Sequence, residues 1–180
     1  MPSPIPLPKI KIGNVVPGAV AVETAHKGVN ETFIGLIALP EGPVRAYIKI
    51  LQNRRQLVNE LISTALGRAA GLHIPEGFLL NALAEDLPES KFLAKHSEEV
   101  LIFGSAAVDR LSLQRRFIKP ETEIMAELFS KWKGWVKAAI FDEWIANPDR
   151  HSGNLLMGNF DHVWLIDHAH AMTGPFWEEA

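Results

Sequence analysis

Residues with the types and spacing needed for chemistry gather late in the sequence, in NPDRHSGNLLMGNFDHVWLIDHAH at 147–170. Asp149, Arg150 and Asn154 fall within one short connection, and Asp167 comes directly after an apolar pair. Ionised groups at the end of an apolar strand are costly unless something compensates their charge. The segment therefore predicts a site in which a cation or a charged partner balances these carboxylates.

A hairpin would bring these side chains together. Two apolar runs flank Gly158-Asn159-Phe160-Asp161, which is a hairpin signal. A hairpin from Asn154 to Asp167 places these two residues side by side, with Asp149 near both. Two carboxylates about 4 Å apart repel by roughly 4 kcal/mol at an effective dielectric near 20, and Mg²⁺ removes that cost. Asn154 and Asp167 are thus the expected Mg²⁺ ligands, and Asp149 is free to accept a proton, as in phosphoryl transfer.

These residues resemble the catalytic part of protein kinases. Asp149 and Asn154 match the D-x-x-x-x-N of the kinase catalytic loop, and LIDHA at 165–169 stands where kinases carry a metal-binding aspartate. HipA-like kinases and, more distantly, the phosphatidylinositol-kinase group are what the segments NPDRHSGNLL and VWLIDHAHAM most resemble. AYIKI is similar to the strand with the nucleotide-binding lysine, here Lys49. NELISTALGRAAGLHIPEG resembles the HipA-family helix that supplies a glutamate, here Glu60.

The resemblance implies a fold and an activity. The fold is α+β and two-lobed, like a protein kinase, with an antiparallel-sheet N-lobe, one helix, and a reduced, mostly helical C-lobe. The activity is transfer of the γ-phosphoryl group of ATP, with Mg²⁺, to a hydroxyl group, most simply a serine or threonine of a protein. ATP and Mg²⁺ are the expected cofactors. Asp149 would orient and deprotonate the acceptor.

Nucleotide binding would fall to the first half of the chain. Lys49 would hold the α and β phosphates as a point charge, and Glu60 would pair with it. Lys49 could instead be a surface lysine on an exposed strand face. Glu60 lies nearly opposite the apolar stripe of its helix, so it could be a solvated residue.

Adenine and phosphate contacts are expected at three further places. LIFGSAAV would form the adenine slot through backbone groups near Phe103 and Ser105, although an ordinary buried strand also fits. AHKGVNETFIG stands in place of a glycine-rich loop, and Lys27 and Gly28 could present a cation and backbone N–H groups; a plain polar hairpin is the alternative. Arg150 could neutralise a carboxylate or a transferring phosphoryl group, or make a structural hydrogen bond.

Two other functions stay open. A kinase-like module could hold nucleotide, or only a partner protein, without catalysis. A metal-dependent hydrolase could use the histidines of the same segment together with its aspartates; the candidate ligands are His151, His162, His168, His170, Asp149 and Asp167.

The positioning elements follow from periodicity and turn residues. Runs of Val, Ile and Phe after Ala19, separated by Gly, Pro and Asn, fit an antiparallel meander. Residues 57–69 keep helical spacing, as do residues 121–146, which Gly134 divides in two. Gly104 should break the strand that precedes it and form a hinge.

The expected domains are a proline-rich arm at 1–18, an N-lobe at 19–105 and a shortened C-lobe at 106–180 that carries the catalytic and metal-binding loops. Prolines keep the arm out of the middle of a sheet. The chain stops thirteen residues after Asp167, so a partner protein could complete the C-lobe.

The composition of the chain limits the classes of partner that we expect it to bind. A net charge of -3 gives no reason to expect nucleic acid or an anionic membrane. With no cysteine, the 180-residue chain has neither disulfides nor a thiolate zinc site. No apolar run approaches the roughly 18 residues of a membrane span. The expectation is a cytoplasmic protein that acts on a protein or a small-molecule acceptor.

Overall fold

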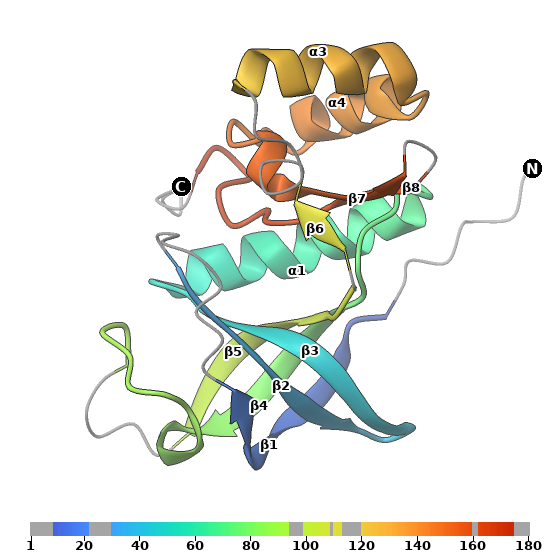
Figure 1. Ribbon diagram of the computed structural model, residues 1–180. Coiled ribbons are helices and arrows are strands. Elements are labelled where there is room, and N and C mark those ends of the chain that lie inside the picture. Colours follow the sequence, from blue (N-terminus) through green and yellow to red (C-terminus); the bar gives the residue numbers. More distant parts are fainter. Residues whose placement is uncertain are drawn as a thin grey trace, which may run out of the picture.

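The computed structural model describes residues 9–21, 30–93, 99–108, 110–112, 120–159 and 162–174. A barrel of five strands forms one part of the molecule, and two helices with a small sheet form the described residues of the other (Figure 1). Helix α1 (Arg54–Ala69) lies between them. Within the described part of the chain, none of the helices combines the length and apolar character needed to cross a membrane.

The barrel contains β1 to β5 in the order β1-β2-β3-β5-β4. Its strands are β1 (Lys11–Ala21), β2 (Glu31–Leu39), β3 (Gly42–Ile50), β4 (Gly77–Leu83) and β5 (Glu99–Ala106). The neighbours β1-β2, β2-β3, β3-β5 and β5-β4 are antiparallel, as expected. A parallel pairing of β1 with β4 closes the barrel, so the expectation of a purely antiparallel sheet is wrong at this one place.

The first strand corrects the expected N-terminal arm. Residues 11–18 belong to β1, which pairs with β2 on one side and with β4 on the other. The barrel tolerates Pro17 because the pairing with β2 shifts register between Val15 and Val20. Gly18 supplies the left-handed φ of 69° within this irregularity. The arm is therefore part of the barrel from Lys11 onward.

The expected break at Gly104 is also absent. β5 runs unbroken to Ala106, and Gly104 pairs with Ile48 on β3 and with Phe78 on β4. A Cβ on Gly104 would lie 2.5 Å from Cδ1 of Leu80. The glycine is thus needed for close packing inside the barrel, not for a hinge.

Helix α1 buries a polar face. Asn53 caps its start by accepting a hydrogen bond from the Gln56 N–H at 3.0 Å. Val58 and Ile62 of the expected apolar stripe are partly exposed. The buried polar residues of the helix are Gln56, Asn59, Glu60, Ser63 and Thr64. Apolar periodicity therefore indicated the helix correctly but not the face that is buried.

Among its described residues, the other part of the molecule contains two helices and one hairpin. Helices α3 (Glu121–Lys131) and α4 (Trp135–Trp144) are separated at Gly134, as expected. Strands β7 (Leu155–Asn159) and β8 (His162–Leu165) form the expected hairpin. The short strand β6 (Leu111–Ser112) pairs with β7. Short 3-10 turns lie at Ala84–Asp86 and Ser152–Asn154.

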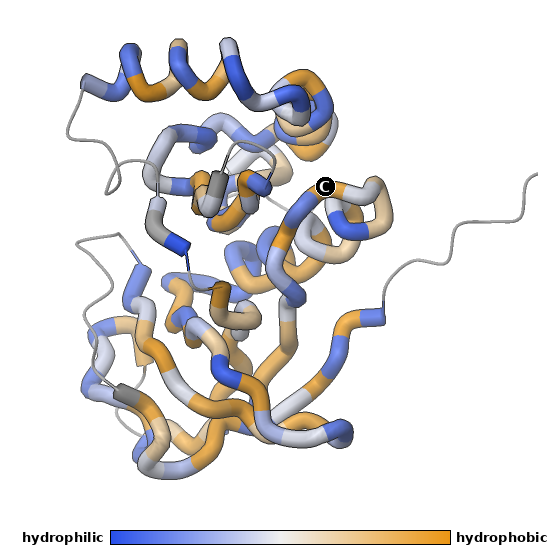
Figure 2. The backbone as a smooth tube through the Cα atoms, turned by 45° about the vertical axis from the view of Figure 1, so that its right-hand side comes forward, coloured by the Kyte–Doolittle hydropathy of each residue, from blue (hydrophilic) through white to orange (hydrophobic). Residues whose placement is uncertain are grey.

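Each part has its own hydrophobic core. Apolar residues recur along the barrel strands and along the helices of the other part (Figure 2). The barrel core includes Ile37, Ile48, Phe78, Leu80 and Ile102. The second core includes Leu128, Phe141, Leu155, Val163 and Leu165. The hairpin that carries the expected site therefore lies on a packed base, which fixes the residues at its two ends.

Candidate active site

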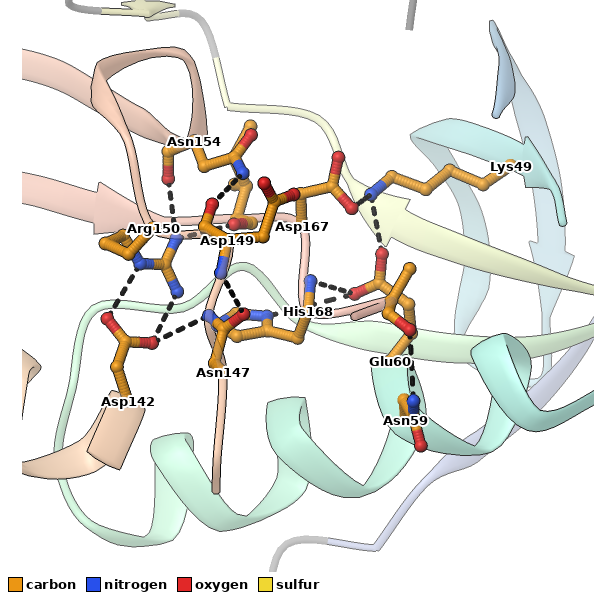
Figure 3. Close-up of polar contacts among 12 residues, drawn as sticks. Lys49, Asn59, Glu60, Asp142, Asn147, Asp149, Arg150, Asn154, Asp167 and His168 are labelled. Carbon is orange, nitrogen blue, oxygen red and sulfur yellow. Dashed lines mark hydrogen bonds and ion pairs between the residues drawn. The ribbon is translucent and has the colours of Figure 1, made fainter. Parts of the chain in front are cut away.

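Lys49 lies near the end of β3 and contacts two carboxylates. Its neighbours Ile48 and Ile50 are buried in the barrel core, so strand alternation puts Lys49 on the opposite face. There its Nζ lies 2.6 Å from Oε1 of Glu60 and 3.2 Å from Oδ1 of Asp167 (Figure 3). Lys49 is only 8% exposed. It is therefore not a surface lysine.

Glu60 connects α1 to two other elements. Its Oε1 accepts from Lys49, and its Oε2 accepts from the backbone N–H of His168 at 3.0 Å. Glu60 is 1% exposed, so it is not the solvated helix residue that periodicity allowed. Both carboxylate oxygens have partners, which a buried charge requires.

Charge pairing keeps Lys49 and Glu60 ionised. Burial alone would lower the pKa of Lys49, but the charges of Asp167 and Glu60 outweigh burial and raise that pKa above its ordinary value. Burial alone would raise the pKa of Glu60, whereas the charge of Lys49 lowers it well below its usual range. Burial lowers the pKa of His168, with a further contribution from the charge of Arg150, so its imidazole is neutral at pH 7.

Asp167 has an unusual backbone. Its φ is 60°, in the left-handed region that non-glycine residues rarely adopt. Such a conformation costs on the order of 1–3 kcal/mol and persists where its surroundings fix it. Two neighbouring hydrogen bonds do so: His168 N–H to Glu60, and Ile166 N–H to the carbonyl of Asn154 at 3.1 Å. The side chain of Asp167 is 35% exposed, so part of it remains accessible to a ligand.

Hydrogen bonds within the expected catalytic loop hold Asp149 and Asn154 in place. Asn154 donates from Nδ2 to the carbonyl of Asp149 at 2.9 Å, which leaves its side-chain oxygen as an acceptor. The N–H of Asp149 donates to Oδ1 of Asn147 at 3.3 Å. The hairpin register pairs Leu155 with Leu165. The ends of the hairpin, Asn154 and Asp167, are thus brought to the same side of the site.

Arg150 is committed to structural bonds. Its Nε and Nη2 each donate to the carboxylate of Asp142 on α4 at 2.9 Å. Its Nη1 donates to the carbonyls of Asn154 at 2.9 Å and Ile166 at 2.7 Å. These bonds join α4, the loop and the hairpin (Figure 3). They favour the structural alternative for Arg150, so we treat it as a positioning residue.

Several residues of the site carried no usable signal in the sequence. Asp142 and Asn147 are buried and bonded to one another, from Asn147 Nδ2 to Asp142 Oδ1 at 2.9 Å. Asn59 is fully buried beside the segment after Asp167. Asp142 and Asn147 are common polar residues outside the recognised motif, and Asn59 bonds to backbone carbonyls more than a hundred residues away. The only signal in the sequence that could have found such residues is a helix whose polar residues share one face, because that face can be the buried one.

The expected adenine contacts do not fit β5. Phe103 lies opposite Lys49 on β3 and Leu79 on β4, and Ser105 lies between the same two strands. The sheet therefore uses the backbone groups of this stretch. Phe103 instead buries its ring beside Lys49, with Nζ 6.0 Å from the ring centroid. Lys27 and Gly28, the other expected nucleotide contacts, lie outside the described residues.

The donor types suit Mg²⁺ better than a transition metal. Asn154 offers an amide oxygen and Asp167 a carboxylate, and Mg²⁺ takes few protein oxygens and completes its shell with water and phosphate. Across the described ranges, no group of three or more His, Cys, Asp or Glu side chains is placed to hold a metal ion. The ring of His162 lies 5.5 Å from that of His73, whereas His168 is buried near Glu60. This arrangement does not support a His/Asp hydrolase.

Comparison with solved structures identifies a protein with a similar fold. Among solved structures, the chain is similar to the Helicobacter pylori proinflammatory kinase CtkA, with a TM-score of 0.51 at 14% sequence identity. The similarity covers 84% of this chain and 56% of CtkA, so the chain spans little more than half the length of that kinase. This likeness shows a shared kinase-like fold. No curated protein matches the sequence.

The family comparison is more direct. The model of the HipA-like kinase family matches residues 44–180. This range holds Lys49 and Glu60 as well as the expected catalytic loop and the segment with Asp167. Because the match covers more than half of the chain, this protein belongs to the HipA-like kinase family.

Proposed function

We propose that the chain is an ATP- and Mg²⁺-dependent kinase that transfers the γ-phosphoryl group of ATP to a serine or threonine hydroxyl of a protein. The observation that carries the proposal is the arrangement around Lys49. Nζ of Lys49 contacts Glu60 at 2.6 Å and Asp167 at 3.2 Å, and Asn154 is bonded to Asp149. A cation for phosphates and oxygens for Mg²⁺ thus converge from β3, α1 and both ends of the hairpin.

Each residue has a task in this reaction. Lys49, held by Glu60, would bind phosphate oxygens. Asp149 would orient the acceptor hydroxyl and accept its proton as the oxygen bonds to the γ-phosphorus, while the bond to the β–γ bridging oxygen breaks and ADP leaves. Asn154 and Asp167 would hold Mg²⁺, which supplies positive charge to the phosphates. Arg150 would fix the loop that carries Asp149 and Asn154.

The acceptor and any partner are further parts of the proposal. A protein serine or threonine is what the family resemblance implies, and a small-molecule hydroxyl is the other outcome of the test. A partner protein that completes the helical part stays a prediction. Val136, Ile140 and Trp144, all exposed along α4, form the apolar strip that such a partner would cover.

The test separates binding from transfer. ATP binding is measured by calorimetry with and without Mg²⁺, and transfer is measured as ADP formation and as phosphate incorporated into the chain or into serine and threonine peptides. We expect Asp149→Asn to keep ATP binding and to lower transfer at least 100-fold, in line with the loss of a general base. We expect Lys49→Met to weaken ATP binding at least tenfold.

Lys133→Met is the matched control for Lys49, because Lys133 is exposed and lies in the connection between α3 and α4; it should change neither binding nor transfer. Transfer unchanged in Asp149→Asn would reject the assigned base. ATP binding without transfer in the wild type would indicate a nucleotide-binding module. No ATP binding at all would reject the proposed function.

A further inference from the structure

Helix α1 bonds to the segment that follows Asp167 through a residue next to Glu60. Asn59 is 0% exposed, and its Nδ2 donates to the carbonyls of Ala169 at 3.0 Å and Ala171 at 2.8 Å. The carbonyl of Gly174 lies at the limit of bonding, 3.5 Å away. One side chain therefore links α1 to carbonyls spread over six residues of the later segment. Figure 3 shows Asn59 next to Glu60 on α1.

The segment needs such a restraint. Asp167, Met172 and Thr173 all have left-handed φ values, of 60°, 56° and 68°. Ala169 and Ala171 are fully buried, so their carbonyls cannot turn to water without moving the chain. The segment lies beyond the end of β8, outside the strand ladder. Asn59 instead donates the hydrogen bonds that the carbonyls of Ala169 and Ala171 would otherwise lack.

The same turn of α1 also fixes the lysine. Glu60, the next residue, accepts from Lys49 through one oxygen and from the His168 N–H through the other. Asn59 and Glu60 together hold the backbone on the C-terminal side of Asp167 at residues 168, 169 and 171. The distance of 3.2 Å between Lys49 Nζ and Asp167 Oδ1 is thus set from a single helical turn.

We propose that Asn59 is a positioning residue for Asp167: it fixes residues 168–171 against α1 and so holds the Asp167 carboxylate at the place where Mg²⁺ would be bound. The effect of Asn59 on catalysis rests on the proposed function. The proposal also has a consequence for the protein without nucleotide, which is the rigidity of the segment itself.

The test compares Asn59→Ala with Ser63→Ala. Ser63 lies one turn further on the same buried face of α1, is 0% exposed, and its Oγ has no hydrogen-bond partner in the described structure. Ser63→Ala therefore removes a buried polar atom from this face without removing a bond. Asn59→Val, which fills the volume but has no side-chain hydrogen-bond donor, is the second variant if Asn59→Ala does not fold, and it should show the same faster exchange.

Hydrogen exchange is the first measurement, on the protein without nucleotide. In Asn59→Ala, the amides of residues 168–172 should exchange at least tenfold faster, while those of β3 keep their wild-type rates. Ser63→Ala should leave both sets unchanged. Unchanged protection of residues 168–172 in Asn59→Ala would overturn the proposal, whether or not the wild type binds ATP.

Mg²⁺ dependence is the second measurement. In Asn59→Ala, half-maximal transfer should need at least tenfold more Mg²⁺, whereas ATP binding without Mg²⁺, which depends on Lys49, should stay within twofold of the wild type. A residue with only a structural role would lower the folded fraction and affect both quantities alike, and that result would overturn the positioning role. A wild type that binds no ATP rejects the proposed function, and hydrogen exchange alone then decides whether Asn59 fixes the segment.

Discussion

Glu60 holds two elements of the site, because it accepts hydrogen bonds from Lys49 and from the His168 N–H. It is the only partner of Lys49 in the described residues that is itself fully buried, since the other partner, Asp167, is 35% exposed on its side chain. Taking two charges out of water is costly, and removing one partner of a buried pair typically destabilises a protein by about 3–5 kcal/mol. Changes at Glu60 should therefore affect stability as well as nucleotide binding.

The free energy of unfolding should depend on pH through the protonation of Glu60. The fold lowers the pKa of this carboxyl, so the unfolded chain takes up the proton first as the pH falls below the ordinary value of 4.5. The stabilisation is thus present above pH 4.5 and is lost on acidification. We expect Glu60→Gln to be less stable at pH 7, and its free energy of unfolding to fall less steeply below pH 4.5, by up to about 1.4 kcal/mol per pH unit.

Urea denaturation between pH 3 and 7 measures this slope. Glu127→Gln is the control, because Glu127 pairs with Lys131 on the surface of α3 at 2.7 Å, where such pairs contribute about 0.3–0.5 kcal/mol. It should keep the wild-type slope. Equal slopes for the wild type and Glu60→Gln would show that Glu60 titrates alike in the folded and unfolded chains.

At the scale of elements, α1 and α4 are helices whose buried faces could not be assigned from hydropathy. α1 turns Asn59 and Glu60 inward because their hydrogen-bond partners lie in the site. α4 exposes Ile140 and Trp144 while it buries Phe141 and Asp142. In both helices the buried face is set by what lies opposite: Gly67 of α1 lets the Phe141 ring approach, and a Cβ there would lie 2.9 Å from Phe141 Cζ.

Two aromatic residues of α4 should differ sharply in their contribution to stability. Phe141 is 3% exposed in the second core, whereas Trp144 is 65% exposed. Phe141→Ala should cost about 3–5 kcal/mol, from lost burial and the cavity left behind. Trp144→Ala should cost less than about 1 kcal/mol, as surface substitutions do. Denaturant midpoints measure both, and comparable losses would mean that α4 buries its other face.

At the scale of the whole molecule, the site draws on both parts of the fold. Lys49 comes from the barrel, Glu60 from α1, and Asp149 and Asp167 from the part with the hairpin. Unfolding of either part separates these residues and abolishes the site. A nucleotide that binds here should therefore stabilise the entire chain.

Thermal unfolding tests this coupling. At a concentration of Mg²⁺-ATP one hundred times its Kd, the gain is about 2.7 kcal/mol. For a chain of this size we expect the Tm to rise by about 5–11 °C in a single transition. Lys49→Met should lose most of this shift. A shift confined to one of two separate transitions would show that the barrel and the helical part unfold independently.

The sequence by itself determined the local parts of the site. The spacing of Asp149 and Asn154, the hairpin up to Asp167 and the division of the later helices at Gly134 all depend on turn residues and apolar runs close together in the chain. These features follow from short-range chemistry, so a single sequence shows them. The lysine strand and the α+β fold class came instead from the resemblance to HipA-like kinases.

Only the tertiary structure decided which polar residues are buried and what they bind. Glu60 and Asn59 have partners more than a hundred residues away in the segment after Asp167, and β1 closes the barrel by pairing with β4 from a distant part of the chain. Hydropathy patterns assume that the inward face is apolar. That assumption fails where a buried polar group is paired across the fold, because its stability then depends on a partner that local sequence does not contain.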